Sequence, residues 1–507
     1  MNEKSPVETV RAENVKQLQL IVSLASNGNI EAAVAQARTL TDSHVASEAW
    51  RVLSEINANS QRWDEAVSQI EIALQHDPNS RRLRLSRALI LAQQGADRAA
   101  LAEFEALARE AHDSPQLLVH LAAQLANAGR IDEAQATLIA ALEQWPTDAA
   151  SHTQLARLRW QRGDGLAAMG AIETAIARHP RELHLRLVAA DLLRSAGESS
   201  QALELLEGGL QLAPDSATFR TSIGTLLEGM DRLDEALPYL RAARALAPQS
   251  VAAARNLVPA LLRSGAQREA LELCDDLLAR FGDDQLLIAQ RATALRLLGA
   301  AEYRELFDYA RLVAAYSLEP APPYSSIAEF NAAFARELAP LHRAVQHPLE
   351  QSLRGGSQTE RHLPRDNPVI AAFFAMLDAP IREYIARLRV DDRTHPVDRR
   401  RRDGYRISGS WSVQLKPGGF HINHVHPRGW LSSAYYVSLP DVSDADTRAG
   451  WLKFGEPGIS IPGCPAEHVV KPAPGMLVLF PSYMWHGTVP FGAGSPRLTA
   501  AFDVIPA

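Results

Sequence analysis

The chain has 507 residues, and 52 Lys and Arg against 59 Asp and Glu give a formal net charge of −7. The absence of a basic domain argues against a nucleic-acid partner. The two cysteines, Cys274 and Cys464, lie far apart, so no disulfide framework is expected. The N-terminus lacks an apolar core and no run reaches membrane-spanning length, so we expect a cytoplasmic protein without a membrane partner.

An alanine recurs every 34 residues between about residues 46 and 300, without an insertion. The members of the series are Ala66, Ala100, Ala134, Ala168, Ala202, Ala236 and Ala270. A second series of small residues at the same interval is Ala88, Ala122, Ala156, Ala190 and Gly224. Small side chains at fixed positions predict two helices that approach each other closely in every repeat.

Glycine and proline repeat at the same interval and mark the turns. The glycines are Gly95, Gly129, Gly163, Gly197, Gly265 and Gly299, with Asp231 as the one lapse. The prolines are Pro78, Pro146, Pro180, Pro214 and Pro248, with His112 filling the gap. This pattern resembles the tetratricopeptide (TPR) repeat, which implies helix pairs stacked into a curved solenoid whose groove binds a protein or peptide.

The chain is therefore predicted to be multidomain, with an all-α TPR solenoid followed by a second module. Residues 1–300 would hold about eight repeats, an irregular first one around Gly28 included, and a closing helix. Residues 301–326 would be a linker, with its plainest break at Ser317–Ser326. Residues 327–404 would be a helical support region that contains a helix at Asn367–Leu388. Residues 405–507 would form a β core, and the Gly-containing loop at residues 347–359 has no assigned role.

The β core carries histidines at ligand-type spacing. A turn at Pro417–Gly419 leads into a predicted strand with His424 and His426, whose side chains would point to the same face. A buried strand at Met476–Phe480 precedes His486, and Arg497 follows eleven residues later. Imidazole nitrogens suit iron, copper, zinc and nickel, and three ligands that leave positions open are typical of non-haem iron oxygenases.

These motifs resemble the Fe(II)/2-oxoglutarate oxygenases, in particular a bacterial and phage subgroup with H-x-H-P and FPS-x-x-x-H segments, and the prolyl hydroxylase core. The resemblance covers roughly residues 405 to 507, through "HINHVHPRGWLSSAYYVSLP", "GWLKFGEP", "PAPGMLVLFPSYMWHGTVPF" and "RLTAAFDV". It implies a double-stranded β-helix (jelly-roll) fold. It also implies Fe(II), 2-oxoglutarate and O2 as cofactor and co-substrates.

Carried over residue by residue, the resemblance makes His424, His426 and His486 the metal ligands. Arg497 matches the basic residue that pairs with the distal carboxylate of 2-oxoglutarate. Thr499 and Tyr436 match two hydroxyl groups near that carboxylate.

The departure from the wider family is His426, since most members have an aspartate there. A neutral third imidazole would leave an Fe(II) site near +2 instead of about +1. Glu456 or Asp446 remains an alternative carboxylate ligand. His421, Arg428 and Trp430 are candidates for substrate contact, although residues of these types beside a strand are more often packing or rim residues.

The sequence thus predicts a 2-oxoglutarate-dependent dioxygenase, a hydroxylase of a protein or peptide substrate recruited by the solenoid. Two alternatives stay open: a TPR scaffold whose barrel binds metal without turnover, and a small-molecule oxygenase whose solenoid serves only assembly. The presence of Arg497 and Thr499 argues against the scaffold, because a non-catalytic barrel needs no co-substrate anchor.

Overall fold

A computed structural model describes most of the chain. The described residues are 16–24, 30–40, 43–59, 62–111, 114–342, 349, 352–359, 362–365, 367–390, 392–402, 404–440, 448–492 and 494–507. Gly28, His112 and Asp446 lie outside them. The chain divides into two compact units, Met1–Leu155 and Ala156–Ala507. This division falls inside the repeat array, within helix α9 (Ala149–Arg162), whereas the sequence pattern predicted the module boundary near residue 300.

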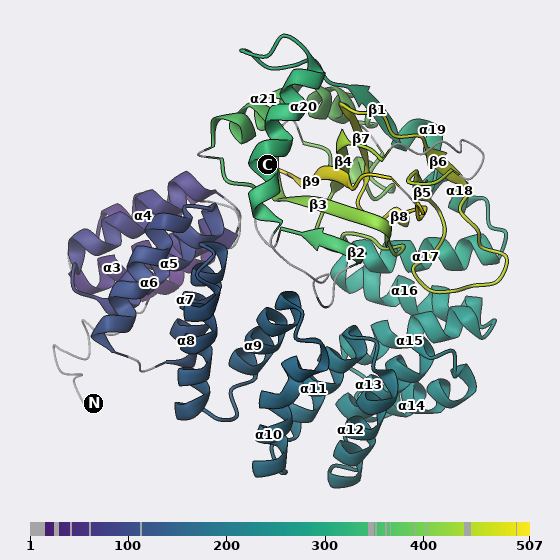
Figure 1. The fold of residues 1–507 in the computed structure, drawn as a ribbon, viewed down its shortest axis with the longest axis horizontal. Helices are drawn as coiled ribbons and strands as arrows, with labels where there is room; N and C mark the ends of the chain where they lie inside the picture. The colour runs from purple at the N-terminus through teal and green to yellow at the C-terminus, as the bar shows by residue number, and fades with distance from the viewer. Residues whose placement is uncertain are drawn as a thin grey trace, which may run out of the picture. The chain divides into compact units, whose positions relative to one another are not determined.

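The first unit is a stack of antiparallel helix pairs (Figure 1). Its helices are α2 (Ile30–Arg38), α3 (Ser43–Asn59), α4 (Trp63–His76), α5 (Arg81–Gln94), α6 (Asp97–Glu110), α7 (Pro115–Asn127) and α8 (Ile131–Gln144). Among the described residues, none of the helices has the length and hydrophobicity that crossing a bilayer needs.

The second unit contains the rest of the repeats and the β domain. After α9, its repeat elements are η1 (Gly165–Met169), α10 (Gly170–Arg178), α11 (Leu183–Ser195), α12 (Ser199–Leu212), α13 (Ala217–Gly229), α14 (Leu233–Leu246), α15 (Val251–Arg263), α16 (Gln267–Phe281) and α17 (Gln285–Leu297).

The structure explains why the same residue types recur at fixed positions of the repeat. All seven alanines of the 34-residue series are at most 1 % exposed, because they lie where neighbouring helices touch. All six glycines of the turn series have φ between 70° and 101°, and Asp231, at the lapse, also has a positive φ of 63°. The position therefore requires the left-handed conformation, which glycine adopts at the lowest cost. At Gly224 a Cβ atom would lie 2.5 Å from Leu240 Cγ, so a larger residue there would require Leu240 to shift.

The β domain follows the solenoid in the chain. Its helical elements are α18 (Glu302–Leu306), α19 (Tyr309–Leu312), α20 (Ile327–Leu338), η2 (Ala339–Leu341), α21 (Pro368–Arg387) and η3 (Asp398–Arg400). Its strands are β1 (Ala314–Ser317), β2 (Leu353–Gln358), β3 (Tyr405–His421), β4 (Leu431–Ser438), β5 (Leu452–Phe454), β6 (His468–Val470), β7 (Met476–Pro481), β8 (His486–Thr488) and β9 (Arg497–Pro506).

The strands form two antiparallel sheets, as expected for a jelly roll. The larger sheet has the order β1-β7-β4-β9-β3-β2 and the smaller one the order β6-β5-β8. Helices α20 and α21 cover the outer face of the larger sheet (Figure 1). There Tyr435 of β4 packs against Phe334 and Phe373 and donates a hydrogen bond to Asn331 Oδ1 (2.6 Å). The inner face of this sheet carries residues that line the candidate site.

Two segments contain elements that the sequence did not predict. Residues 301–326, expected as a linker, contribute α18, α19 and the edge strand β1, which pairs with β7. The Gly-containing stretch at residues 347–359 includes strand β2, which pairs with β3. Its Gly356 lies so close to β3 that a Cβ atom would be 2.2 Å from Gln414 O. The helix expected at Asn367–Leu388 is present as α21, and Asn367 Oδ1 caps it by accepting from Val369 N and Ile370 N.

Helix α17 belongs to the core of the β domain as well as to the repeats. Its Ile288 and Leu295 pack in one cluster with core residues of β4, β7 and β9. The Trp485 indole N–H, next to His486, donates to Thr293 Oγ1 (3.0 Å) and contacts Ala289 O (3.3 Å). The last repeat helix therefore supports the loop that carries a predicted metal ligand.

A truncation series tests this shared core. A chain that starts at Ala301 loses α17, and each buried leucine or isoleucine removed with it costs about 1.5–3 kcal/mol. We expect this fragment to lack cooperative unfolding, while a fragment that starts at Ala149 unfolds cooperatively. Thermal unfolding followed by near-ultraviolet circular dichroism measures the difference. Equally cooperative unfolding of the two fragments would contradict the shared core.

Candidate metal centre

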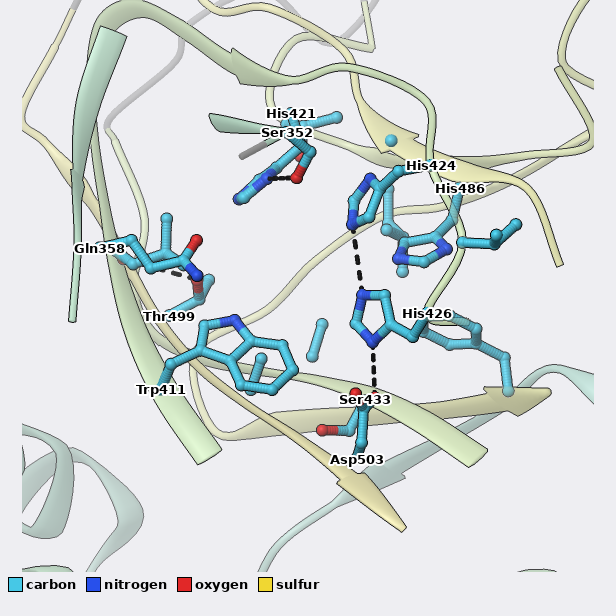
Figure 2. A pocket seen from close by; sticks show the side chains of 18 of the residues that line it. Ser352, Gln358, Trp411, His421, His424, His426, Ser433, His486, Thr499 and Asp503 are labelled. Atoms are coloured by element: carbon cyan, nitrogen blue, oxygen red, sulfur yellow. Dashed lines mark hydrogen bonds and ion pairs between the residues drawn. The ribbon is translucent and has the colours of Figure 1, made fainter. Parts of the chain in front are cut away.

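Three imidazoles meet in a cavity of about 510 Å³ between the two sheets. Each of His424, His426 and His486 offers one nitrogen, and the three ligand atoms lie within 4.8 Å of one another. Figure 2 shows the rings pointing toward a common space, with Asp503 behind His426. The structure thus brings together the three histidines that the sequence selected.

A short backbone bridge joins the two ligand segments. His424 N donates to His486 O (2.9 Å), and His486 N donates to His424 O (3.1 Å). Strand β3 already ends at His421, so His424 and His426 do not lie on one continuous strand as the sequence suggested. His426 is held separately, because its backbone N–H donates to Ser482 O (3.0 Å). These three backbone hydrogen bonds therefore align the ligands, in place of the alternation of side chains along one strand.

Each of the three imidazoles uses Nδ1 for a hydrogen bond within the protein. His424 Nδ1 bonds Ile422 O (2.8 Å), and His486 Nδ1 bonds Met484 O (2.9 Å). His426 Nδ1 lies 2.5 Å from Asp503 Oδ1. Because all three acceptors are oxygens, Nδ1 carries the proton in each ring, and Nε2 keeps its lone pair for a metal.

Electrostatics favour the neutral form of the His424 and His486 rings. Burial lowers the pKa of His424 to about 3, and the nearby His426 acts in the same direction. Burial also lowers the pKa of His486 well below its usual value, again assisted by the neighbouring histidines. A metal binds the neutral imidazole, so these groups need no deprotonation at neutral pH.

Arg497 is a buried cation at the start of β9. It is 4 % exposed, and its Nη1 donates to Thr488 Oγ1 (3.2 Å), whereas its Nε has no hydrogen-bond partner. Its guanidinium lies 5.0 Å from the centre of the Tyr436 ring, and the buried Tyr436 hydroxyl also has no hydrogen-bond partner. Burial lowers the pKa of Arg497 and raises that of Tyr436. A buried cation that has no acidic partner among the described residues and lies beside a buried hydroxyl suits an anionic ligand.

Strand β9 presents every second side chain to the cavity. Arg497, Thr499, Ala501 and Asp503 all line it. The Thr499 hydroxyl contacts Val413 O at 3.5 Å, which leaves it available for a ligand. Asp503 was not predicted from the sequence, although the period of two that relates Arg497 and Thr499 continues to it.

The three predicted substrate-contact residues have different positions. His421 lines the cavity, and its Nδ1 bonds Ser352 Oγ (2.9 Å). Arg428 is exposed at the cavity rim. The structure does not bring Trp430 to the cavity, because its indole is 1 % exposed and its Nε1–H donates to Val397 O (2.9 Å). Trp430 is a packing residue, and Gln358 and Trp411 line the cavity instead.

The alternative carboxylate Glu456 lies outside the histidine cluster. It lines an adjoining cavity of about 320 Å³ and pairs with Lys453 Nζ. Among the described lining residues of the main cavity, Asp503 is the only carboxylate.

Comparisons with known proteins agree with this organisation. A family model described as "Putative 2OG-Fe(II) oxygenase" matches residues 409–503. A second one, described as "Tetratricopeptide repeat", matches residues 18–69, 58–115, 153–217 and 221–285. The chain therefore carries TPR repeats followed by a domain similar to 2-oxoglutarate/Fe(II) oxygenases, as the motifs indicated. A search of the curated proteins found no match.

Two of the similar solved structures are described as TPR proteins. TTC0263, a thermophilic TPR protein of Thermus thermophilus, shares 26 % identity over 36 % of this chain and 100 % of its own, with a TM-score of 0.29. A TPR protein of Parabacteroides merdae shares 16 % identity over 48 % of this chain and 97 % of its own (TM-score 0.33). The Cut9–Hcn1 structure of APC/C shares 18 % identity over 48 % of each chain (TM-score 0.29).

Single substitutions test the ligand set. We expect His424→Ala, His426→Ala and His486→Ala each to weaken Fe(II) binding by at least about tenfold, because each removes one of three nitrogens. Anaerobic titration with Fe(II) measures the affinity, and far-ultraviolet circular dichroism checks the fold. His468→Ala is the matched control, since His468 lies outside the cavity lining, on β6, and stacks on Tyr309. Normal iron binding by His426→Ala would remove it from the ligand set.

Proposed function

We propose that the protein is an Fe(II)/2-oxoglutarate-dependent dioxygenase that hydroxylates a protein or peptide substrate recruited by its TPR repeats. One observation carries the proposal: three Nε2 atoms converge in the same cavity as a buried arginine whose Nε has no partner. The nitrogens fit a metal with open positions, and the arginine fits the free carboxylate of a chelating oxo-acid.

Each group of side chains has a defined task in this proposal. His424, His426 and His486 hold the iron, which supplies the activation of O2 coupled to oxidation of 2-oxoglutarate. Arg497 binds the distal carboxylate through parallel charge-assisted hydrogen bonds, and Thr499 and Tyr436 offer hydroxyl groups beside it. Apolar side chains form part of the cavity wall and lower the local dielectric around these electrostatic contacts. The walls include Val413, Leu452 and Phe480.

The position of the repeats supports a protein or peptide substrate. TPR solenoids present extended surfaces that commonly bind proteins. In the second unit, Ile459 and Ile461 of the loop after β5 pack against the cluster formed by helices α14 to α17. The same loop lines the cavity that adjoins the metal centre. This loop therefore connects the repeat helices with the cavity next to the candidate metal centre.

Arg497 variants test the co-substrate role. One charge-assisted hydrogen bond is worth about 1.5–3 kcal/mol, and about 1.4 kcal/mol is a factor of ten. Arg497→Ala should therefore weaken 2-oxoglutarate binding at least about tenfold while iron binding is retained. Arg497→Lys should recover part of the loss, because lysine keeps the charge but not the planar fork.

Titration of 2-oxoglutarate into the anaerobic Fe(II) protein, followed by the metal-to-ligand charge-transfer absorption, measures this affinity. An affinity that is the same in all three proteins would contradict the role of Arg497. A wild-type protein that binds Fe(II) but shows no such absorption would favour the scaffold alternative.

Mass spectrometry identifies the substrate class. Cell lysate incubated with the protein, Fe(II) and 2-oxoglutarate should yield peptides with a mass increase of 16 Da, and the same reaction with His486→Ala should not. Oxidised metabolites in the absence of oxidised peptides would favour the small-molecule oxygenase.

A further inference from the structure

We propose that Asp503 is the anionic partner of the metal centre and acts through His426. In most related oxygenases a carboxylate binds the iron directly. Here the carboxylate would lie on strand β9 and contact the iron ligand His426 instead of the iron. The inference rests on the proposed function and adds to it a positioning residue, which neither the motifs nor the comparisons assign.

The contact between Asp503 and His426 is direct and sheltered. Asp503 Oδ1 lies 2.5 Å from His426 Nδ1, and the two side chains are 16 % and 14 % exposed. Ser432 Oγ donates to the same oxygen (2.7 Å) and in turn lies 2.9 Å from Ser482 Oγ. Trp411 covers the imidazole, with ring centres 5.5 Å apart. Because these contacts fix both partners, the carboxylate can orient the ring that presents Nε2 to the metal.

The three ligands are not equivalent in this respect. His424 and His486 bond neutral backbone carbonyl groups, whereas His426 bonds a carboxylate. His426 is also the position at which the family pattern has an aspartate. Among the ion pairs of the described residues, Asp503 has His426 as its one partner. The carboxylate of Asp503 therefore bonds His426, the one ligand that stands where the family pattern has a charged residue.

Among the described residues, the other charged side chains that line the cavity are cationic, so the carboxylate of Asp503 contributes to the charge balance of the site. Arg497 and Arg428 also line it, so an Fe(II) ion held by three neutral imidazoles would add to a positive environment. A carboxylate that accepts the imidazole N–H makes the other ring nitrogen a stronger ligand and offsets part of the charge of the ion. Asp503 is the group on this cavity that can do so, since Glu456 faces the adjoining one.

Removal of the charge with little change in shape tests the proposal. Asp503→Asn keeps a hydrogen-bond acceptor in the same place but is neutral. We expect it to weaken binding of Fe(II), and of Co(II) as an air-stable probe, by about 10- to 100-fold. The double variant His426→Asp with Asp503→Asn returns the carboxylate to the ligand position, and we expect it to bind both metals more tightly than Asp503→Asn alone. Anaerobic calorimetry measures Fe(II), and the visible absorption of Co(II) reports the geometry of its ligands.

Glu456→Gln is the matched control, because it removes a carboxylate that lines the adjoining cavity and should leave metal affinity unchanged. The thermal unfolding of each metal-free variant shows whether the fold is intact. An affinity of Asp503→Asn within about twofold of the wild type, or a loss that the double variant does not recover, would overturn the proposal. Absence of metal binding in the wild-type protein would instead remove the proposed function.

Discussion

The metal centre depends on the backbone bridge between His424 and His486. It links the end of β3 in the larger sheet to β8 in the smaller one, and so sets the distance between the two ligand segments. Here the same residues that bond through their backbones also converge through their side chains, and acceptors on Nδ1 fix each ring. Preorganisation of this kind is what a metal with open positions requires.

The bridge is in turn supported by the repeats. Trp485, which precedes His486, donates to Thr293 of α17, and Arg296 of the same helix donates to Gly455 O (2.8 Å) and Pro465 O (3.0 Å). Gly455 N then donates to Trp485 O (2.9 Å). Helix α17 therefore contacts both the loop that precedes His486 and the loop that follows β5, next to the candidate metal centre. The repeats of the second unit are structural neighbours of the site, and the break between compact units lies far upstream of it in the chain.

Strong periodicity and rare residue types made much of the fold and site predictable from sequence. The 34-residue series marked buried alanines and left-handed turns, and the histidine and arginine spacing located the three histidines that converge in the cavity and the buried cation beside them. Strand β2 was missed because its sequence, LRGGSQ, has few β-forming residues, and its glycines are needed for close approach to β3. The role of α17 in the β core was missed because the repeat pattern accounts equally well for its apolar residues. Trp430 shows the remaining difficulty, since only the fold shows whether an aromatic side chain beside a strand faces the cavity or the core. Asp503, in contrast, lies on the same period of two as Arg497 and Thr499, so the strand pattern could have found it.

Anomalous X-ray diffraction at the iron edge, from crystals grown anaerobically with Fe(II) and 2-oxoglutarate, would locate the metal and the co-substrate together. We expect one iron peak in the cavity, bound to Nε2 of His424, His426 and His486, with 2-oxoglutarate chelating the iron and its far carboxylate on Arg497. A peak at Glu456 in the adjoining cavity, or 2-oxoglutarate bound away from Arg497, would contradict this expectation.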